Sequence, residues 1–110
     1  MNIQGLGDLM KQAKHMQAEM ERLQAEVGER RVEGSAGGGL VTVVANGRGE
    51  IVSVRIDPEA AAEDREMLQD LVVAAANDAL RKARELMTQE MGRMVGGLGL
   101  PPGLFHPGGL

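Results

Sequence analysis

Few side chains in this sequence are of the types that carry out catalysis. The histidines are His15 and His106, and the hydroxyl groups belong to Ser35, Thr42, Ser53 and Thr88. Covalent catalysis needs a nucleophile, a base and an orienting group held together, and no spacing in the chain predicts such a set. The chain has no cysteine and no HExxH pattern, so it offers neither thiolate ligands nor a familiar zinc motif. We therefore expect a protein that is not an enzyme and has no metal or cofactor.

A glycine-rich run at residues 34–39, GSAGGG, has the composition of a phosphate-binding loop. Loops of that kind carry Gly-Lys-Ser or Gly-Lys-Thr and open a helix whose N-terminus meets the phosphate. Here β-branched residues follow the glycines, so no helix is predicted at that point. We interpret the run as a conformationally permissive connector, and we predict no small-molecule substrate.

Basic residues are the remaining candidates for a binding site, and they form two clusters. The first consists of Lys11, Lys14 and Arg22, and the second of Arg81, Lys82 and Arg84. Both fall in segments with helical periodicity, where exposed cations can neutralise DNA phosphates. A solvated helix face is the alternative, because Asp78 and Lys82 have the spacing of an ordinary ion pair along a helix. The net charge of −4 argues against coating of nucleic acid by bulk charge, so DNA binding would depend on these clusters.

The first helix is predicted from about Leu6 to Val27, and its apolar residues recur at spacings of three and four. These residues are Leu6, Leu9, Ala13, Met16, Met20, Leu23 and Val27. They form a narrow heptad seam, which favours a partner helix over a broad core. Lys11, Lys14 and Arg22 fall on the opposite side of the helix. We predict that a dimer interface runs along the seam and includes Leu9, Met16, Met20 and Leu23. Gly28 is expected to end the helix.

Three strands of a small antiparallel sheet are predicted in the middle of the chain. β-branched residues favour strands at Val41–Ala45 and Ile51–Ile56, and Glu29–Glu33 is a weaker candidate. The tetrad Asn46–Gly49 joins the two stronger strands, because Asn and Gly tolerate the positive φ of a tight turn. Alternation in the last strand predicts a half-buried apolar face formed by Val52, Val54 and Ile56.

A second long helix is predicted from about Arg65 to Arg93, with an alanine-rich face that permits close packing. Asp57 and Pro58 favour a helical turn immediately after the last strand. Residues 92–110 are rich in glycine and proline and are predicted to form a flexible tail, which leaves residues 1–91 as the folded domain. The leucines and Phe105 of this tail offer an alternative interpretation, a docking motif.

Three stretches of the chain carry a resemblance to a known family. They are LMKQAKHMQAEMERLQAEV, VEGSAGGGLVTVVANGRGEIVSVRIDPE and LQDLVVAAANDALRKARE. Together they resemble the YbaB/EbfC family of bacterial nucleoid-associated proteins, over about Leu9 to Met94. The resemblance implies an α+β fold, in which an α-β-β-β-α protomer has a small antiparallel sheet flanked by two long helices, in a dimeric, tweezers-like arrangement. It also implies binding of double-stranded DNA by the helices, and a location in the cytoplasm and nucleoid.

The small core and the narrow seam independently favour a second copy of the chain. We therefore predict a homodimer that binds double-stranded DNA through Lys11, Lys14, Arg22, Arg81, Lys82 and Arg84. No apolar run is long enough to span a bilayer, so no membrane partner is predicted. The alternative function is a protein-interaction adaptor that uses the helices and the tail. Strong salt dependence of DNA binding would favour the first function.

Overall fold

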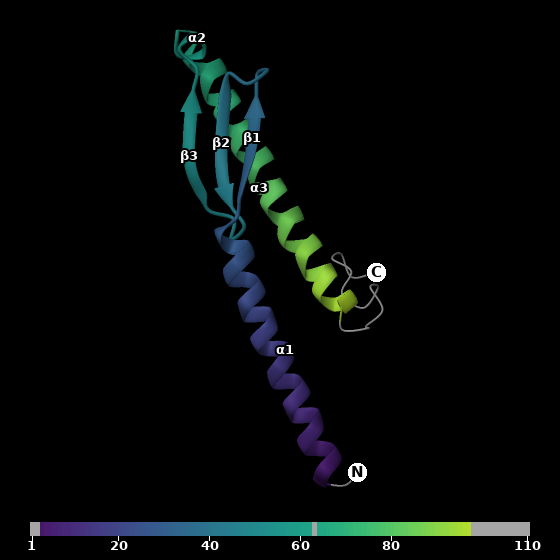
Figure 1. Cartoon of the computed structure of the whole chain (residues 1–110). Coiled ribbons are helices and arrows are strands. Elements are labelled where there is room, and N and C mark those ends of the chain that lie inside the picture. Colours follow the sequence, from purple (N-terminus) through teal and green to yellow (C-terminus); the bar gives the residue numbers. More distant parts are fainter. Residues whose placement is uncertain (1–2, 63, 98–110) are drawn as a thin grey trace.

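The computed structural model describes residues 3–62 and 64–97, which form six elements (Figure 1). In chain order these are α1 (Ile3–Glu29), β1 (Arg31–Ala36), β2 (Val41–Asn46), β3 (Ile51–Ile56), α2 (Pro58–Ala61) and α3 (Arg65–Gly97). The predicted α+β class and α-β-β-β-α order are confirmed. The short α2 is the helical turn predicted at Pro58. The carboxylate of Asp57 caps it by accepting a hydrogen bond from the Glu59 N–H at 2.9 Å.

The three strands form an antiparallel sheet in the order β1-β2-β3, so β2 is central and β3 is an edge strand. β1 extends to Ala36, so the prediction that residues 34–36 belong to the glycine connector is wrong. The reversal lies at residues 37–40, where three glycines have positive φ. Gly34 is paired with Val43 inside the sheet, and a Cβ there would overlap backbone atoms of Ala79 in α3. Glycine at this position therefore allows close packing of the helix rather than a turn.

The predicted turn between β2 and β3 is confirmed. The side-chain oxygen of Asn46 accepts hydrogen bonds from the N–H groups of Arg48 and Glu50, each at 3.0 Å. Gly49 has a φ of +87°, which favours glycine. A Cβ on Gly47 would overlap the carbonyl group of Val27, so this glycine lets the hairpin pack against the end of α1.

The core lies between α3 and one face of β1 and β2 (Figure 1). Its fully buried residues are Val41, Val43 and Ala45 from β2 and Ala75, Ala79 and Ala83 from α3. The small alanine side chains allow α3 to lie close to the sheet, as its composition predicts. Hydrogen bonds add to this packing at the edge of β1. Lys82 donates to the Glu33 carbonyl at 3.0 Å, and Asp78 accepts from the Ser35 N–H at 3.1 Å.

β3 lies where it is predicted, but the expected half-buried face is wrong for the single chain. Every residue of β3 is exposed. Val54 is paired with Val43 and Ile56 with Val41, so both point toward the same side of the sheet as the buried core. They are exposed because α3 covers β1 and β2 and leaves β3 largely bare. This edge of the protomer therefore presents an uncovered apolar surface.

Both long helices extend beyond their predicted ends. α1 continues through Gly28 to Glu29. The side chain of Arg48 lies where a Cβ on Gly28 would be, and it forms an ion pair with Glu29 at 2.9 Å. α3 continues to Gly97, so residues 92–97 are helical and the predicted boundary at residue 92 falls within the helix. The rest of the predicted tail, including the docking motif at Phe105, lies outside the described residues.

The N-terminal half of α1 projects away from the sheet (Figure 1). The seam is progressively covered toward the sheet: Leu9 is 56% exposed, Met16 and Met20 are half-buried, and Val27 is buried. The exposed end also carries Leu6 and Met10. α1 is thus a long arm that projects from a compact base, and the base is formed by the sheet and the first half of α3.

Candidate nucleic-acid interface

The outer side of the α1 arm carries two exposed lysines, Lys11 and Lys14. Neither forms an ion pair with any described residue. They fall on the helix face opposite Leu9, as the sequence predicts. Their charges are therefore available to an anionic ligand.

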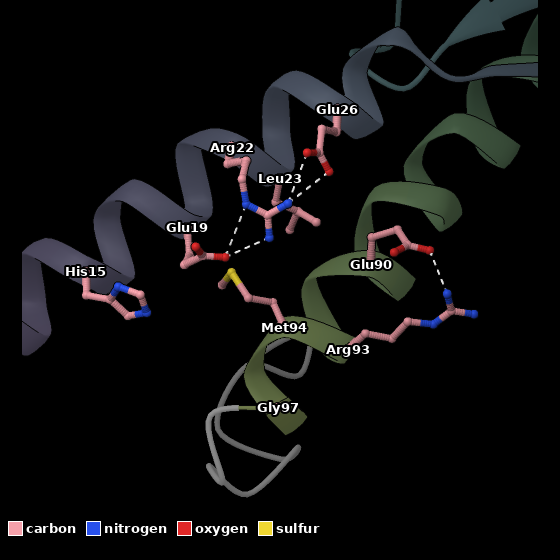
Figure 2. A pocket seen from close by; sticks show the side chains of 9 residues that line it. All are labelled: His15, Glu19, Arg22, Leu23, Glu26, Glu90, Arg93, Met94 and Gly97. Carbon is pink, nitrogen blue, oxygen red and sulfur yellow. Dashed lines mark hydrogen bonds and ion pairs between the residues drawn. The ribbon is translucent and has the colours of Figure 1, made fainter.

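Arg22, the third predicted residue of this cluster, is in a different electrostatic state. Its guanidinium forms ion pairs with Glu19 at 2.7 Å and with Glu26 at 3.0 Å (Figure 2). The hydrogen bonds to Glu19 and then to Glu26 raise the pKa of Arg22, and the same contact lowers the pKa of Glu19. Two carboxylates thus balance its charge locally. A phosphate would have to compete with both of them.

The second cluster divides in the same way. Arg81 forms ion pairs with Asp78 and Glu85, and Lys82 forms one with Asp78 at 3.2 Å, so the ion pair predicted for Lys82 is confirmed. Because Lys82 also donates to a carbonyl of β1, it has a structural role in attaching α3 to the sheet. Arg84 is exposed and forms no ion pair with a described residue.

The described ion pairs separate the twelve lysines and arginines into two equal groups. The paired group is Arg22, Arg30, Arg48, Arg81, Lys82 and Arg93. The group with no ion pair to a described residue is Lys11, Lys14, Arg31, Arg55, Arg65 and Arg84. Only three members of this unpaired group belong to the predicted clusters. The alternating pattern of the strand predicts that Arg55 lies on the polar side. It does not predict that Arg55 lacks an ion-pair partner.

A cleft between α1 and α3 contains charges of both signs (Figure 2). Its lining residues are His15, Glu19, Arg22, Leu23, Glu26, Glu90, Arg93, Met94 and Gly97. Glu90 binds Arg93 at 3.1 Å and Arg30 at 3.3 Å, which ties the base of α1 to α3. Within the described residues, no group of three or more His, Asp or Glu is arranged to hold a metal ion. Because its cations are matched by carboxylates, this cleft is a poor site for a polyanion.

The predicted dimer residues are distributed along the arm. Leu9 lies on the exposed end, Met16 and Met20 are half-buried, and Leu23 points into the cleft toward α3 of the same chain (Figure 2). The inner end of the seam therefore has an intrachain partner. Only its outer end is left open to another molecule.

These features describe a binding protein, with unpaired cations on exposed faces and an apolar sheet edge. The family model of the YbaB/EbfC DNA-binding family matches residues 1–98, and the chain belongs to that family. The resemblance predicted from the sequence is thus confirmed. No helix within residues 3–62 and 64–97 combines the length and apolar character needed to cross a membrane.

The names of two relatives agree with this assignment, and one solved structure has a similar fold. A nucleoid-associated protein of Pelotomaculum thermopropionicum is 57% identical over 101 residues, covering 91% of this chain and 95% of the relative. One from Acetivibrio thermocellus is 55% identical, covering 91% and 89%. The crystal structure of the uncharacterized protein HP0035 from Helicobacter pylori matches with a TM-score of 0.70 and 30% identity. That match covers 87% of this chain and 99% of the other.

Proposed function

We propose that the protein is a homodimer that binds double-stranded DNA and is not an enzyme. Its location is the nucleoid and the cytoplasm that surrounds it. Membership of the DNA-binding family and the names of the relatives support the DNA partner. The observation that carries the dimer is the uncovered apolar surface of β3. The unpaired cations of the helices support the mode of contact with DNA.

The exposed part of β3 is unusually apolar for an edge strand. Its large apolar residues are Ile51, Val52, Val54 and Ile56. An edge strand also presents unpaired backbone N–H and C=O groups, which makes it a template for pairing with another strand. Soluble proteins normally protect such edges with charge, a bulge or a covering element. Here the strand has one charged residue, Arg55, and one register shift, where Ala45 of β2 pairs with Ile51.

α3 contributes a second wall beside this surface. Lys82 and Asp78 attach one flank of the helix to β1, and by helical periodicity Val73 falls on the opposite flank. Val73 is 60% exposed. A second copy related by a two-fold axis would pair its β3 with this one and place its own α3 over the apolar strand. That isologous arrangement would pair the free backbone N–H and C=O groups of both edge strands. It would also cover Val73 and the valines of β3 in both copies.

Dimerisation would also double the number of unpaired cations, which is small in one chain. The contribution of the helices would come from Lys11, Lys14 and Arg84, with Arg22, Arg81 and Lys82 available only when their carboxylate partners release them. Contacts of this kind fall mainly on phosphates, so discrimination between sequences should be low. The 16 acidic residues oppose binding, and we expect an affinity of about 1–100 μM at physiological salt.

Fluorescence anisotropy with two unrelated duplexes, at two salt concentrations, tests the DNA partner. We expect similar affinities for both duplexes and a slope of log K against log salt of about −3.6, for about four phosphates neutralised per dimer. Lys11→Glu combined with Lys14→Glu should weaken binding to both duplexes and make the slope shallower. Absence of binding at low salt would overturn the proposal.

One observation supports an adaptor as the second candidate. Leu6, Leu9 and Met10 form an exposed apolar patch on the projecting end of α1, and patches of this kind often mark protein-binding sites. Leu9→Gln, which adds no charge near Lys11 and Lys14, should leave DNA binding intact if the first proposal holds. A protein that binds no duplex, and that retains a stoichiometric partner only while Leu9 is present, would put the adaptor function first.

A further inference from the structure

The face of the sheet that points away from α3 carries a polar surface that none of the described helices covers. Val32 and Ala36 of β1 pack against the core, so the alternate residues Arg31, Glu33 and Ser35 point to the opposite side. α3 lies on the core side, and α1 leaves the sheet at one end (Figure 1). We call this surface the outer sheet face, and its β2 and β3 positions follow from the strand register.

A row of hydrogen-bond donors crosses all three strands of the outer sheet face. Ser35 is paired with Thr42, and Thr42 is paired with Arg55. Directly paired residues share a face, so two hydroxyls and one guanidinium are aligned. Ser35 and Arg55 are exposed at the two ends of the row, and Thr42 is 8% exposed between them.

Arg31 adds a second guanidinium at the far end of β1, opposite Asn46. Both Arg31 and Arg55 are exposed, and neither forms an ion pair with a described residue. Glu33 is the only carboxylate in the three strands, so positive charge exceeds negative charge among the strand residues. This is the opposite of the mixed, self-neutralised cleft between α1 and α3.

Arg48, in the turn between β2 and β3, is an arginine whose charge is balanced by neighbouring carboxylates. Its guanidinium binds Glu29 at 2.9 Å and Glu50 at 3.1 Å, and the hydrogen bond to Glu29 is the main cause of its raised pKa. Arg31 and Arg55 have no such partners among the described residues. Their fork of N–H donors is therefore free to bind an oxyanion.

We propose that the outer sheet face binds the phosphate backbone of duplex DNA. This site rests on the proposed function, because it adds a contact surface to the same ligand. Guanidinium groups and hydroxyls are the donors that proteins commonly offer to phosphate oxygens, and no residue in the row is needed to read a base. If two β3 strands pair at their edges, the two faces join into one surface with four arginines. The two copies of Arg55 then lie nearest the two-fold axis.

The proposal predicts that DNA crosses the base of the dimer as well as the projecting helices. Arg31→Gln combined with Arg55→Gln tests it, with an unlabelled dimer titrated into a fluorescent duplex of about 20 base pairs, roughly the length of two helical turns. The matched control is Arg48→Gln combined with Arg93→Gln, which removes the same charge from two arginines that already bind carboxylates and belong to neither predicted DNA-binding cluster. Light scattering and circular dichroism accompany each variant.

We expect the outer-face variant to bind about tenfold more weakly at low salt, as for the loss of a charged hydrogen bond. Its slope of log K against log salt should be shallower by at least about 0.9, the value for one phosphate. The control should change binding less than about twofold, within the range of a screened charge effect. Arg31→Lys combined with Arg55→Lys keeps the charge and should recover most of the slope.

Equal weakening by the outer-face variant and the control would mean that net charge alone is responsible, and it would overturn the proposal. So would an outer-face variant that binds like the parent while Lys11→Glu with Lys14→Glu weakens binding; the proposed function would then stand without this site. A parent protein that binds no duplex at low salt would remove both proposals. If the glutamine pair alters the mass or the fold, Arg55→Gln alone and the lysine pair give the same comparison.

Discussion

β2 and β3 are neighbouring valine-rich strands with opposite environments. Val43 is fully buried beneath α3, whereas Val54, its partner across the ladder, is 46% exposed. The two side chains point to the same side of the sheet and differ in what lies above them. An apolar alternation therefore shows which side chains share a face of the sheet, whereas their burial depends on what packs above that face. In our account a second copy packs above β3.

The largest expected effect comes from a charge on the covered side of this pair. Val43→Asp would bury a carboxylate against alanines, where burial of an unpaired charge costs several kcal/mol. We expect this variant to be unfolded at 25 °C, with the loss of both the helical circular dichroism signal and a cooperative melting transition. A folded variant with the mass of the parent would show that position 43 is not in the core.

The same substitution on the other side of the pair should act on association. Val54→Asp places the carboxylate in the proposed interface, at a cost of about 3 kcal/mol or more, which raises the dimer dissociation constant by more than roughly 100-fold. Light scattering should then give the mass of one chain. Ser53→Asp is the control, because Ser53 points to the opposite side of the sheet, and its mass should stay that of the parent. Equal masses for both variants would remove β3 from the interface.

The turn that sets β3 against β2 should show an intermediate effect. Gly49 has a φ of +87°, and a β-branched residue there is strained by about 1–3 kcal/mol. Gly49→Val should therefore lower the melting temperature by about 4 °C or more. Gly92→Ala is the contrasting variant, because Gly92 lies in α3 with open space around it, and alanine should raise stability slightly. A melting curve for Gly49→Val that matches the parent would contradict the observed turn.

A smaller, pH-dependent effect is expected where α3 is bonded to β1. The hydrogen bond from the Ser35 backbone N–H, followed by that from Lys82, lowers the pKa of Asp78 below its usual value. Its stabilisation is therefore fully present above the unfolded pKa of about 3.9 and is lost as the pH falls through the lower, folded pKa. Between pH 7 and pH 3, Asp78→Asn should lose less melting temperature than the parent. An identical loss in both proteins would show that this carboxylate does not contribute to acid sensitivity.

The helices, the strands and the turn at Asn46 were predictable from the sequence, because periodicity and turn chemistry are local. Gly34 was misinterpreted because its reason is tertiary: the backbone of α3 passes over it. The exposure of Val54 was not predictable, because alternation shows which residues share a face and does not show what covers it. Among the candidate site residues, the ion pairs of Arg22 could have been predicted, because Glu19 and Glu26 lie at helical spacing from it. The unpaired state of Arg31 and Arg55 was not predictable, because it depends on which face of the sheet the helices cover.

The mass of the intact protein in solution is the most direct measure of whether a second copy covers β3. Multi-angle light scattering at micromolar concentration measures it without any assumption about shape, which matters for a chain with a projecting helix. If β3 is covered by a second copy, the mass should be twice the 11.7 kDa of one chain. A stable mass of 11.7 kDa across that concentration range would contradict the account, because the apolar edge of the sheet would then face water.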